Sequence, residues 1–361
     1  MHSPGFLLRA NRPDHKNKTR LTGRNHMRRN WLAALPLACC TLAWAAPQDD
    51  PIQPHPAMLS ELADQSIVTD IGHAGDTLIA VGERGHILRS TDGKRWSQVE
   101  SPVSVMLNRV TFVNDQIGWI GGHDATILKT IDGGQSWTLL NYQPELEQAV
   151  YDLHFFDADN GLAVGAYDLF WRTEDGGASW SPVDSPVGQG ELHHYSITEL
   201  ADGTLLIAGE RSMLARSTDQ GQTWERVASP YFGSYFGAVP NGETGAIIFG
   251  LRGNVYLLPN IASLPTLEGD EYGEYPLGEI PDGQVTQLRF DGTDSLFNGV
   301  ATETGALMVG VNGTIVEYRN GTSELTRVDG GGAAALGDIH LLADLRALGG
   351  ETGLNHIDSG R

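Results

Sequence analysis

The sequence is poor in cysteine, in basic residues and in long apolar runs. Its 361 residues include 2 cysteines, and 24 Lys and Arg stand against 45 Asp and Glu, which gives a net charge of −21. Residues 46–361 alone hold 16 basic and 44 acidic residues, a net charge of −28. A chain this acidic is a poor ligand for phosphate backbones and anionic lipid surfaces, so the composition argues against a nucleic-acid partner.

The longest apolar run lies near the start of the chain, at residues 31–44. It is shorter than the roughly 18 to 20 residues that a membrane-spanning helix needs. Arg28 and Arg29 precede the run, and Ala43 and Ala45 form a small-x-small cleavage pattern at its end. This order is typical of a secretory signal peptide. We therefore predict cleavage near Ala45, export to the periplasm and no insertion of the mature chain in the membrane.

The sequence divides into three parts: an N-terminal extension with a cleaved signal peptide over 1–45, a linker over 46–56, and one domain over 57–361. Both cysteines, Cys39 and Cys40, fall in the first part, so the exported part would contain none. A domain of this size can bury its own core without disulfides. The sequence leaves open whether Met1 or Met27 is the natural start.

Glycine and internal repetition are abundant. The 45 glycines exceed the usual share of about 7%, which indicates many turns. Four similar segments end in tryptophans that lie 41, 43 and 44 residues apart: Trp96, Trp137, Trp180 and Trp224. Strand-like units with a period of about 40–45 residues are typical of β-propeller blades.

Three weaker copies, at residues 249–258, 309–318 and 348–357, bring the number of repeats to seven. The glycines that we align are Gly82, Gly121, Gly165, Gly209, Gly250, Gly310 and Gly349. Alternation and turn signals divide the first repeat into four strands, at Ser66–Gly72, Thr77–Gly82, His86–Thr91 and Trp96–Glu100. The sequence therefore predicts an all-β fold, a seven-bladed β-propeller of four-stranded antiparallel blades. We name the strands of a blade A to D in chain order.

Two features interrupt the pattern. The last repeat stops after its third strand, near Ile357, so we expect residues near Ala57–Ala63 to supply its fourth strand and to close the ring by pairing the two ends of the chain. Residues 259–283 hold six acidic residues with several prolines and glycines. We predict an acidic surface insertion there, between strands C and D of blade five.

The tryptophans end a motif, Ser/Thr-x-Asp-x-Gly-x-Ser/Thr-Trp, that fits residues 130–137, 173–180 and 217–224 and is one residue short at 90–96. Its Asp can accept backbone N–H bonds within a C–D hairpin, its Gly can adopt a positive φ, and its Trp can pack between sheets. Each Asp serves its own turn, so the four cannot converge on a catalytic or metal site. We assign a structural role to Asp92, Trp96, Asp132, Trp137, Asp175, Trp180, Asp219 and Trp224.

This motif is the Asp-box, or bacterial neuraminidase repeat. With the fuller pattern of residues 81–93 and seven copies behind a signal peptide, the chain resembles the photosystem II stability/assembly factor family over nearly all of 57–358. The last three blades match only in strands B and C. The resemblance implies a non-catalytic propeller, without cofactor, that helps to assemble a membrane protein complex on the lumenal or periplasmic side. In a non-photosynthetic host it implies an exported accessory protein with another membrane client, for which an RND-type transporter is one candidate. We expect a monomer.

The B–C turns share one face of the predicted ring with the loops that join the blades. One position in these turns varies from blade to blade: Arg84, His123, Tyr167, Arg211, Arg252, Asn312 and Glu351. A position that varies in this way is not required by the fold, and the family resemblance also implies an arginine-bearing face. We predict a partner-binding ring there that consists of Arg84, His123, Tyr167, Arg211, Arg252 and Asn312.

The three arginines would form a local positive cluster suited to a carboxylate-bearing partner. The alternative is that these arginines are solvated and pair with Glu83, Glu210 or Asp168. An aromatic group at the start of blade five would either add an anchor on this face or line the channel: Tyr231, Phe232, Tyr235 and Phe236.

The alternative function is that of an Asp-box glycoside hydrolase, because sialidases also carry this motif. Sialidases resemble six-bladed propellers with an Arg-Ile-Pro motif, which this sequence lacks. No pair of carboxylates stands out as a hydrolytic pair. The adjacent His193 and His194 would point to opposite faces of a strand, so they do not predict a metal site. We predict a protein that is not an enzyme.

Overall fold

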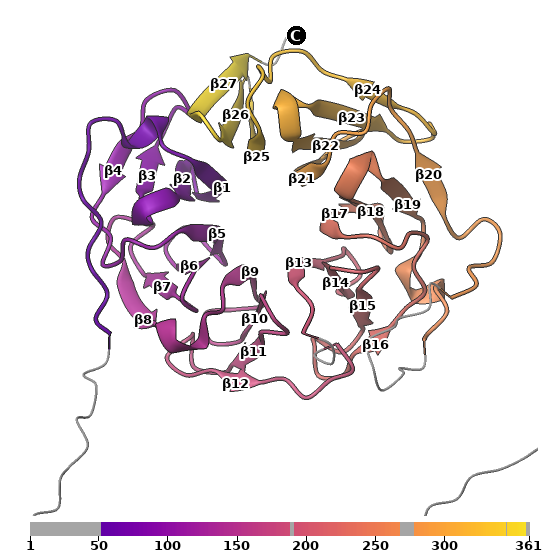
Figure 1. The fold of residues 1–361 in the computed structure, drawn as a ribbon, viewed down its shortest axis with the longest axis horizontal. Coiled ribbons are helices and arrows are strands. Elements are labelled where there is room, and N and C mark those ends of the chain that lie inside the picture. Colours follow the sequence, from indigo (N-terminus) through magenta and orange to yellow (C-terminus); the bar gives the residue numbers. More distant parts are fainter. Residues whose placement is uncertain (1–51, 188–190, 268–277, 344, 359–361) are drawn as a thin grey trace, which may run out of the picture. The chain divides into compact units, whose positions relative to one another are not determined.

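The computed structural model describes residues 52–187, 191–267, 278–343 and 345–358. The predicted signal peptide and its cleavage site lie outside these residues. Seven antiparallel sheets form a ring (Figure 1), and we call the axial region enclosed by their first strands the channel. Among the described residues, no helix is long and apolar enough to cross a membrane. The predicted seven-bladed, all-β propeller is therefore confirmed.

Each blade begins at the channel and ends at the outer edge of the ring. Blade one consists of β1 (Val68–Ala74), β2 (Thr77–Gly82), β3 (Ile87–Ser90) and β4 (Ser97–Val99). Blade two consists of β5 (Leu107–Phe112), β6 (Gly118–Gly122), β7 (Ile127–Thr130) and β8 (Thr138–Asn141). Blade three consists of β9 (Val150–Phe155), β10 (Gly161–Gly165), β11 (Phe170–Thr173) and β12 (Ser181–Pro182). Blade four consists of β13 (His194–Glu199), β14 (Leu205–Gly209), β15 (Leu214–Ser217) and β16 (Glu225–Arg226).

The last three blades follow the same order. Blade five consists of β17 (Tyr235–Asn241), β18 (Gly245–Gly250), β19 (Val255–Leu258) and β20 (Thr286–Leu288). Blade six consists of β21 (Leu296–Thr302), β22 (Gly305–Gly310), β23 (Ile315–Arg319) and β24 (Leu325–Arg327). Blade seven has three strands, β25 (Leu336–Leu342), β26 (Leu345–Gly350) and β27 (Gly353–Asp358). In the described residues, the 3₁₀ turn η1 (Ala63–Gln65) precedes β1, and five further 3₁₀ turns lie between strands: η2 (Glu83–Gly85), η3 (Pro144–Leu146), η4 (Leu251–Gly253), η5 (Ile261–Ser263) and η6 (Val311–Gly313).

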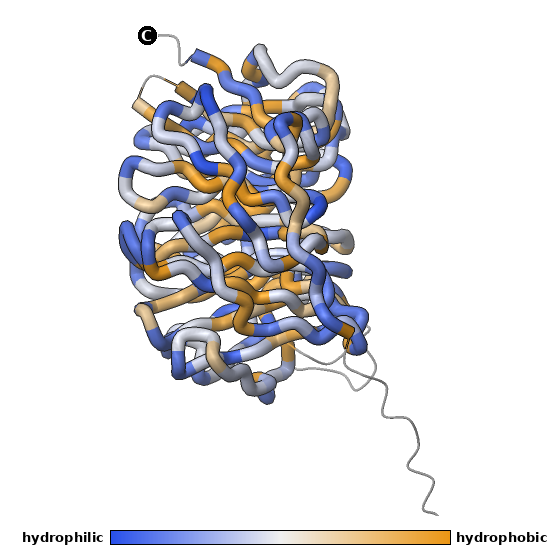
Figure 2. The backbone as a smooth tube through the Cα atoms, turned by 90° about the vertical axis from the view of Figure 1, so that its left-hand side faces the viewer, coloured by the Kyte–Doolittle hydropathy of each residue, from blue (hydrophilic) through white to orange (hydrophobic). Residues whose placement is uncertain are grey.

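The core lies between neighbouring blades. Strand B is buried along almost its whole length in every blade, because it lies in the middle of its sheet and is covered on both faces. Ile79 and Val81 of blade one, for example, pack against Val110 and Ile120 of blade two. Figure 2 shows apolar segments along the strands and many hydrophilic segments in the turns. Burial on both sides accounts for the apolar residues of strand B within the repeated segments.

The ring does not close in the way that the sequence suggested. Within the described residues, blade seven has no fourth strand, and the segment near Ala57–Ala63 contributes none. That segment instead contacts the outer strand of blade one, where the Ala57 N–H donates to the Ser101 carbonyl (3.1 Å). The 3₁₀ turn η1 packs against both β27 and β4. Blade seven joins blade one mainly through β25 and β1, so the strands beside the channel make the closing contact.

Residues 259–283 lie between β19 and β20, which are strands C and D of blade five. The described part of this insertion folds back onto blade four, where Thr266 pairs with Val227 just after β16. The Arg216 guanidinium donates to the carbonyls of Ile261, Ala262 and Leu264, each at 2.9 Å. The insertion therefore extends the outer edge of blade four.

Candidate partner-binding face and channel mouth

The wall of the channel is built from strand A of each blade (Figure 1). In all seven of these strands the pairing with strand B shifts directly after the first pair, which marks a β-bulge. A bulge leaves one residue unpaired and re-aims its side chain, so the bulged residue and its successor can both face the channel. The bulged residues are Thr69, Asn108, Tyr151, Tyr195, Phe236, Phe297 and Gly337. Their successors are Asp70, Arg109, Asp152, Ser196, Gly237, Asn298 and Asp338.

Three of these successors are buried aspartates that each bind the backbone of the next blade. Asp70 accepts the Val110 N–H at 2.8 Å. Asp152 accepts the Ile197 N–H at 3.0 Å, and Asp338 accepts the Ile71 N–H at 2.8 Å. The Asp338 bond joins blade seven to blade one across 267 positions of sequence. These carboxylates therefore connect neighbouring blades along the channel.

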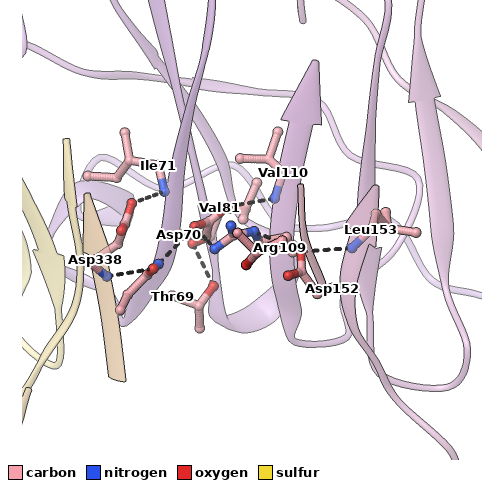
Figure 3. A network of polar contacts seen from close by, with 12 residues as sticks. Thr69, Asp70, Ile71, Val81, Arg109, Val110, Asp152, Leu153 and Asp338 are labelled. Carbon is pink, nitrogen blue, oxygen red and sulfur yellow. Dashed lines mark hydrogen bonds and ion pairs between the residues drawn. The ribbon is translucent and has the colours of Figure 1, made fainter. Parts of the chain in front are cut away.

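Arg109 lies between two of these carboxylates (Figure 3). Its Nη1 is 3.1 Å from Asp70 Oδ1, and its Nε is 3.0 Å from Asp152 Oδ1. Burial, together with the neighbouring Asp70 carboxylate, raises the pKa of Asp338 to about 7, although the Arg109 charge acts in the opposite direction. Burial also raises the pKa of Asp152. One guanidinium thus only partly compensates three buried carboxyl groups.

A cavity of about 330 Å³ opens above this network at the channel mouth. Four aromatic side chains from four consecutive blades form one side of it, with ring centroids 5.1 to 5.6 Å apart between neighbours: Tyr151, Tyr195, Phe236 and Phe297. The other three blades place Thr69, Asn108 and Gly337 at the same position. The cavity therefore has an aromatic side and a small, polar side. Its lining also includes Glu351 of a B–C turn, so the mouth opens on the face that carries those turns.

The B–C turns adopt one repeated backbone conformation, which corrects two of the predicted alignments. The residues at the tips of these turns have a positive φ: Arg84 (57°), Asp124 (56°), Tyr167 (52°), Arg211 (50°), Arg252 (59°) and Asn312 (57°). His123 lies one position earlier, where its N–H donates to Met106 as the Glu83 N–H does to Ile67. Glu351 occupies this earlier position in blade seven. The equivalents of Arg84 in these two blades are therefore Asp124 and Thr352.

A double glycine causes both errors. Blades two and seven end strand B with Gly121-Gly122 and Gly349-Gly350. The glycine that pairs with the first residue of strand A is Gly122 in blade two and Gly350 in blade seven, as it is Gly82 in blade one. The sequence alone offers both glycines equally, because the side-chain pattern around them does not distinguish the two registers.

The three turn arginines do not form one cluster. Arg211 and Arg252 belong to the adjacent blades four and five, whereas Arg84 belongs to blade one across the ring (Figure 1). All three are exposed, and none forms an ion pair with a residue of the described part of the chain. Arg84 instead lines a separate groove of about 720 Å³, between blade one and the segment of His55 to Gln65.

The carboxylates suggested as partners of these arginines bind other groups. Glu83 accepts the Ile67 N–H at 3.3 Å, and Glu210 accepts the His193 N–H at 3.4 Å. Asp168 accepts the Leu192 N–H at 3.0 Å. These acids therefore fix the loops that lead into strand A.

The aromatic residues of the face divide into exposed, cavity-lining and core positions. Tyr167 is 55% exposed and contacts His193, whose ring also contacts Tyr151 and Tyr195. Among the aromatics at the start of blade five, Phe232 is exposed, Phe236 lines the cavity, Tyr235 is fully buried and Tyr231 packs beside it. Phe236 thus has the predicted channel-lining position, and the role of Phe232 as an anchor for a partner stays a prediction. A continuous line of aromatic rings runs from the exposed Tyr167 into the channel mouth.

The four motif aspartates lie on the opposite face, each within its own C–D hairpin. Asp132 accepts the Gln135 and Ser136 N–H groups at 2.9 and 3.0 Å and the Thr130 hydroxyl at 2.8 Å. Hydrogen bonds from Ser179 and Thr173 lower the pKa of Asp175 to about 2. Trp137 and Trp224 are buried between blades, and Trp180 and Trp96 are partly buried. Asp92 and Asp219 make the same kinds of contact in their hairpins.

Sequence reasoning missed the residues that line the channel. The buried network of Asp70, Arg109, Asp152 and Asp338 and three of the four aromatic residues were not singled out. Strand A varies most among the repeats, so it gave no alignment from which a shared position could be read. A search for polar residues in an apolar first strand would have found Asp70 and Asp152, which interrupt such strands. His193 and His194 also contribute to no cluster of potential metal ligands in the described part of the chain.

The chain is similar to known assembly factors in sequence and in fold. The family model described as photosynthesis system II assembly factor YCF48 matches residues 88–145 and 139–231. Photosystem II assembly lipoprotein Ycf48 from Synechococcus sp. (strain CC9902) is 32% identical over 76 residues. That match covers 21% of this chain and 23% of the relative, so it spans less than a quarter of the relative's length.

Solved propellers cover most of the chain. YCF48 from Cyanidioschyzon merolae has a TM-score of 0.62 at 16% identity and covers 83% of this chain and 98% of that structure. YCF48 bound to D1 peptide has a TM-score of 0.55 at 17% identity and covers 86% and 98%. The GH74 xyloglucanase from Xanthomonas campestris has a TM-score of 0.57 at 12% identity and covers 84% and 53%. At such identities the structural likeness shows the fold alone, since one fold serves many functions. The sequence matches, which lie within residues 88–231, and the fold together support a resemblance to the photosystem II assembly factor family.

Proposed function

We propose that this chain is a non-catalytic, exported β-propeller that binds a segment of a membrane-protein client and assists its assembly or stability. The observation that carries this proposal is the cavity at the channel mouth, which is walled by aromatic side chains and opens among exposed turn residues. Sites that bind peptides combine such a recessed aromatic anchor with a polar rim. The solved relative that is described as YCF48 bound to D1 peptide supports a peptide-like ligand.

The two faces of the ring differ in what they offer a partner. On the face of the Asp-box hairpins, the polar side chains of the motif are engaged within their own turns. On the face of the B–C turns, which we call the B–C face, Arg84, Arg211, Arg252 and Tyr167 are exposed and the cavity is open. Loops with free side chains on a rigid scaffold are where binding residues concentrate. We therefore assign client binding to the B–C face and include His123 and Asn312 at its edge.

The client depends on the host. In a photosynthetic host it would belong to photosystem II, and elsewhere to another membrane complex, for which an RND-type transporter is one candidate. The acidic composition favours a direct protein contact over binding to anionic lipid. The signal peptide over 1–45 would deliver the protein, as a monomer, to the periplasmic side.

Catalysis is no part of this proposal. The carboxylates beneath the cavity, Asp70, Asp152 and Asp338, each accept a backbone N–H of the next blade. That use is structural and leaves each of them fixed in one orientation. We expect the purified protein to release no product from sialosides, arabinosides or xyloglucan, in contrast to the hydrolase alternative.

The test is capture of the client from cells by crosslinking and mass spectrometry. We compare the natural chain with a triple variant, Arg84→Glu, Arg211→Glu and Arg252→Glu. Because these side chains are exposed, the thermal midpoint should stay within a few degrees. We expect the captured membrane protein to fall at least about tenfold, as opposite charge now faces the client at both sides of the cavity.

A matched control makes the same change of charge on the other face, with Lys94→Glu, Arg95→Glu and Arg319→Glu. These three side chains are largely exposed, and surface ion pairs such as theirs contribute little stability. The control should capture the client as the natural chain does. Equal loss in both variants would assign the effect to net charge, and capture of no membrane protein by the natural chain would overturn the proposal.

A further inference from the structure

The cavity at the channel mouth has a wall of aromatic rings. Tyr151, Tyr195, Phe236 and Phe297 occupy the bulged position of strand A in blades three to six. Their centroids lie 5.6, 5.1 and 5.6 Å apart in that order. The bulge turns each ring into the cavity instead of the core. Neighbouring rings are stacked, edge to face or tilted, so the arc borders the cavity with aromatic surface from four blades.

The floor of the cavity is polar and only partly satisfied. Asp152, Ser196 and Asn298 line it next to Arg109. Ser196 is 7% exposed, and its hydroxyl has no hydrogen-bond partner among the described residues. Buried hydroxyls are normally paired, because an unmade hydrogen bond costs free energy. The wall of the cavity therefore includes a buried hydroxyl that the described residues leave unpaired.

The charges around the cavity decide whether it favours a cationic or an anionic ligand. Among the described residues that line the cavity, Arg109 is the one cation, and the carboxylates are those of Asp152 and Glu351. Asp70 binds Arg109 from below, and Asp338 binds the strand that carries Asp70. Asp70, Asp152 and Glu351 thus outnumber the cation even when Asp338 holds its proton, and charges act more strongly in a partly buried site than in water. A second cation would be stabilised here, whereas an anionic group would be repelled.

We propose that the channel mouth is a binding site for a cationic side chain, a lysine or an arginine, that the client inserts between the aromatic wall and Asp152. Cations bind favourably over Tyr and Phe rings, most strongly where water is excluded. The rim arginines Arg211 and Arg252 would contact acidic residues beside the inserted side chain, so the preferred client segment carries both signs. That the inserted side chain comes from a client rests on the proposed function, whereas the preference of the cavity for a cation does not.

Two small probes that differ by one charged group test this chemistry. N-acetyl-lysine methylamide carries an ammonium group, and N-acetyl-norleucine methylamide lacks it but keeps the apolar chain. Binding is followed by NMR of the isotope-labelled Tyr and Phe rings in the natural chain. We expect the lysine probe to shift the signals of Tyr151, Tyr195 and Phe236 and to bind at least about tenfold more tightly than the norleucine probe, as a cation over several rings would. The affinity should also fall with added salt.

Three variants separate the contributions. Phe236→Leu keeps an apolar side chain and should weaken the lysine probe about three- to thirtyfold. Phe232→Leu, an exposed aromatic of the same face outside the cavity, should have no effect. Asp152→Asn removes charge but keeps shape; if it does not fold, Glu351→Gln at the exposed rim makes the same test with a smaller expected loss.

The outcomes are distinct. Equal binding of both probes would overturn the cation site in favour of an apolar side-chain pocket, and the absence of ring shifts would overturn it altogether. Neither result decides whether the client is captured, because the triple arginine variant tests that separately. Conversely, probe binding without client capture would keep the cavity chemistry and reject the proposed function.

Discussion

Single residues beside the channel combine structural and electrostatic roles. Asp70, Asp152 and Asp338 satisfy backbone N–H groups of the neighbouring blades, and the first two also hold Arg109 in place. Burying charge is costly unless each group has its partners, which explains why these carboxylates come as a set around one guanidinium. The set leaves an excess of negative charge beneath the channel mouth, so the surroundings of the cavity are negatively charged.

The raised pKa of Asp338 makes a prediction for stability against pH. Burial and the Asp70 carboxylate raise this pKa from 3.8 to about 7, so between these values the folded chain holds a proton that the unfolded chain has released. The resulting stabilisation is complete below about pH 4 and is lost as the pH rises through 7. Asp338→Asn removes this dependence. Denaturant unfolding from pH 5 to 8 should show a shallower fall for the variant, with a difference in slope of at most about 1.4 kcal/mol per pH unit.

The natural chain and the variant must be compared, because the buried histidines change the stability with pH in the opposite direction. Burial lowers the pKa of His154 and of His340 to about 4, so both oppose folding as the pH falls below 6.5. These groups are common to the natural chain and the variant and cancel in the difference. Asp358→Asn, which changes an exposed carboxylate, should leave the profile unaltered. An equal slope in Asp338→Asn and the natural chain would show that Asp338 is ionised throughout.

At the level of the strand, the repeats could be recognised from the sequence where the pattern of buried side chains is the same in every blade. Strands B and C alternate or run apolar in every blade, and the predicted second strand of blade one, Thr77–Gly82, coincides with β2. Strand A starts later than expected, at Val68, because its first residues belong to the loop that meets the B–C turn. The bulge that positions both cavity and network depends on this meeting of loop and turn. No local pattern in the strand itself encodes it.

The glycine that ends strand B is required by this close approach. A Cβ at Gly165 would collide with the carbonyl oxygen of Ala149, the residue before strand A. Because backbone cannot yield as a side chain can, Gly165→Ala should cost about 3 kcal/mol or more of stability. Gly203, in the A–B turn of blade four, has φ +83° but no atom within 4 Å of an added Cβ. Gly203→Ala should therefore cost only the conformational strain, about 1 kcal/mol.

Chemical denaturation of the two variants measures both values. Similar losses would show that the meeting of loop and turn can relax, and the assignment of Gly122 and Gly350 to this position would then lose its physical basis.

For the whole molecule, the number of blades followed from the sequence but the closure of the ring did not. Seven periods of about forty residues fix seven blades, because each period is one sheet. Closure depends on contacts between β25 and β1, far apart in the chain, and on the Asp338 bond to Ile71. Three strands suffice in blade seven because η1 packs beside β27. The fourth strand that the last repeat lacks in the sequence is therefore not replaced by another segment of the described chain.

Stepwise removal of the N-terminal segment tests this form of closure. A chain that begins at Glu61 loses the bonds of Ala57 and Ser60 to blade one, which are exposed or lie at the edge of the sheet. It should unfold within about two degrees of a chain that begins at Pro51. A chain that begins at Ile67 also loses η1, where the buried Ala63 packs with Val68 and Ile71. Because this cut opens the junction of blades seven and one, the thermal midpoint should fall by several degrees more. If instead the first cut caused most of the loss, the contacts of Ala57 and Ser60 with blade one, and not η1, would stabilise the junction of blades seven and one.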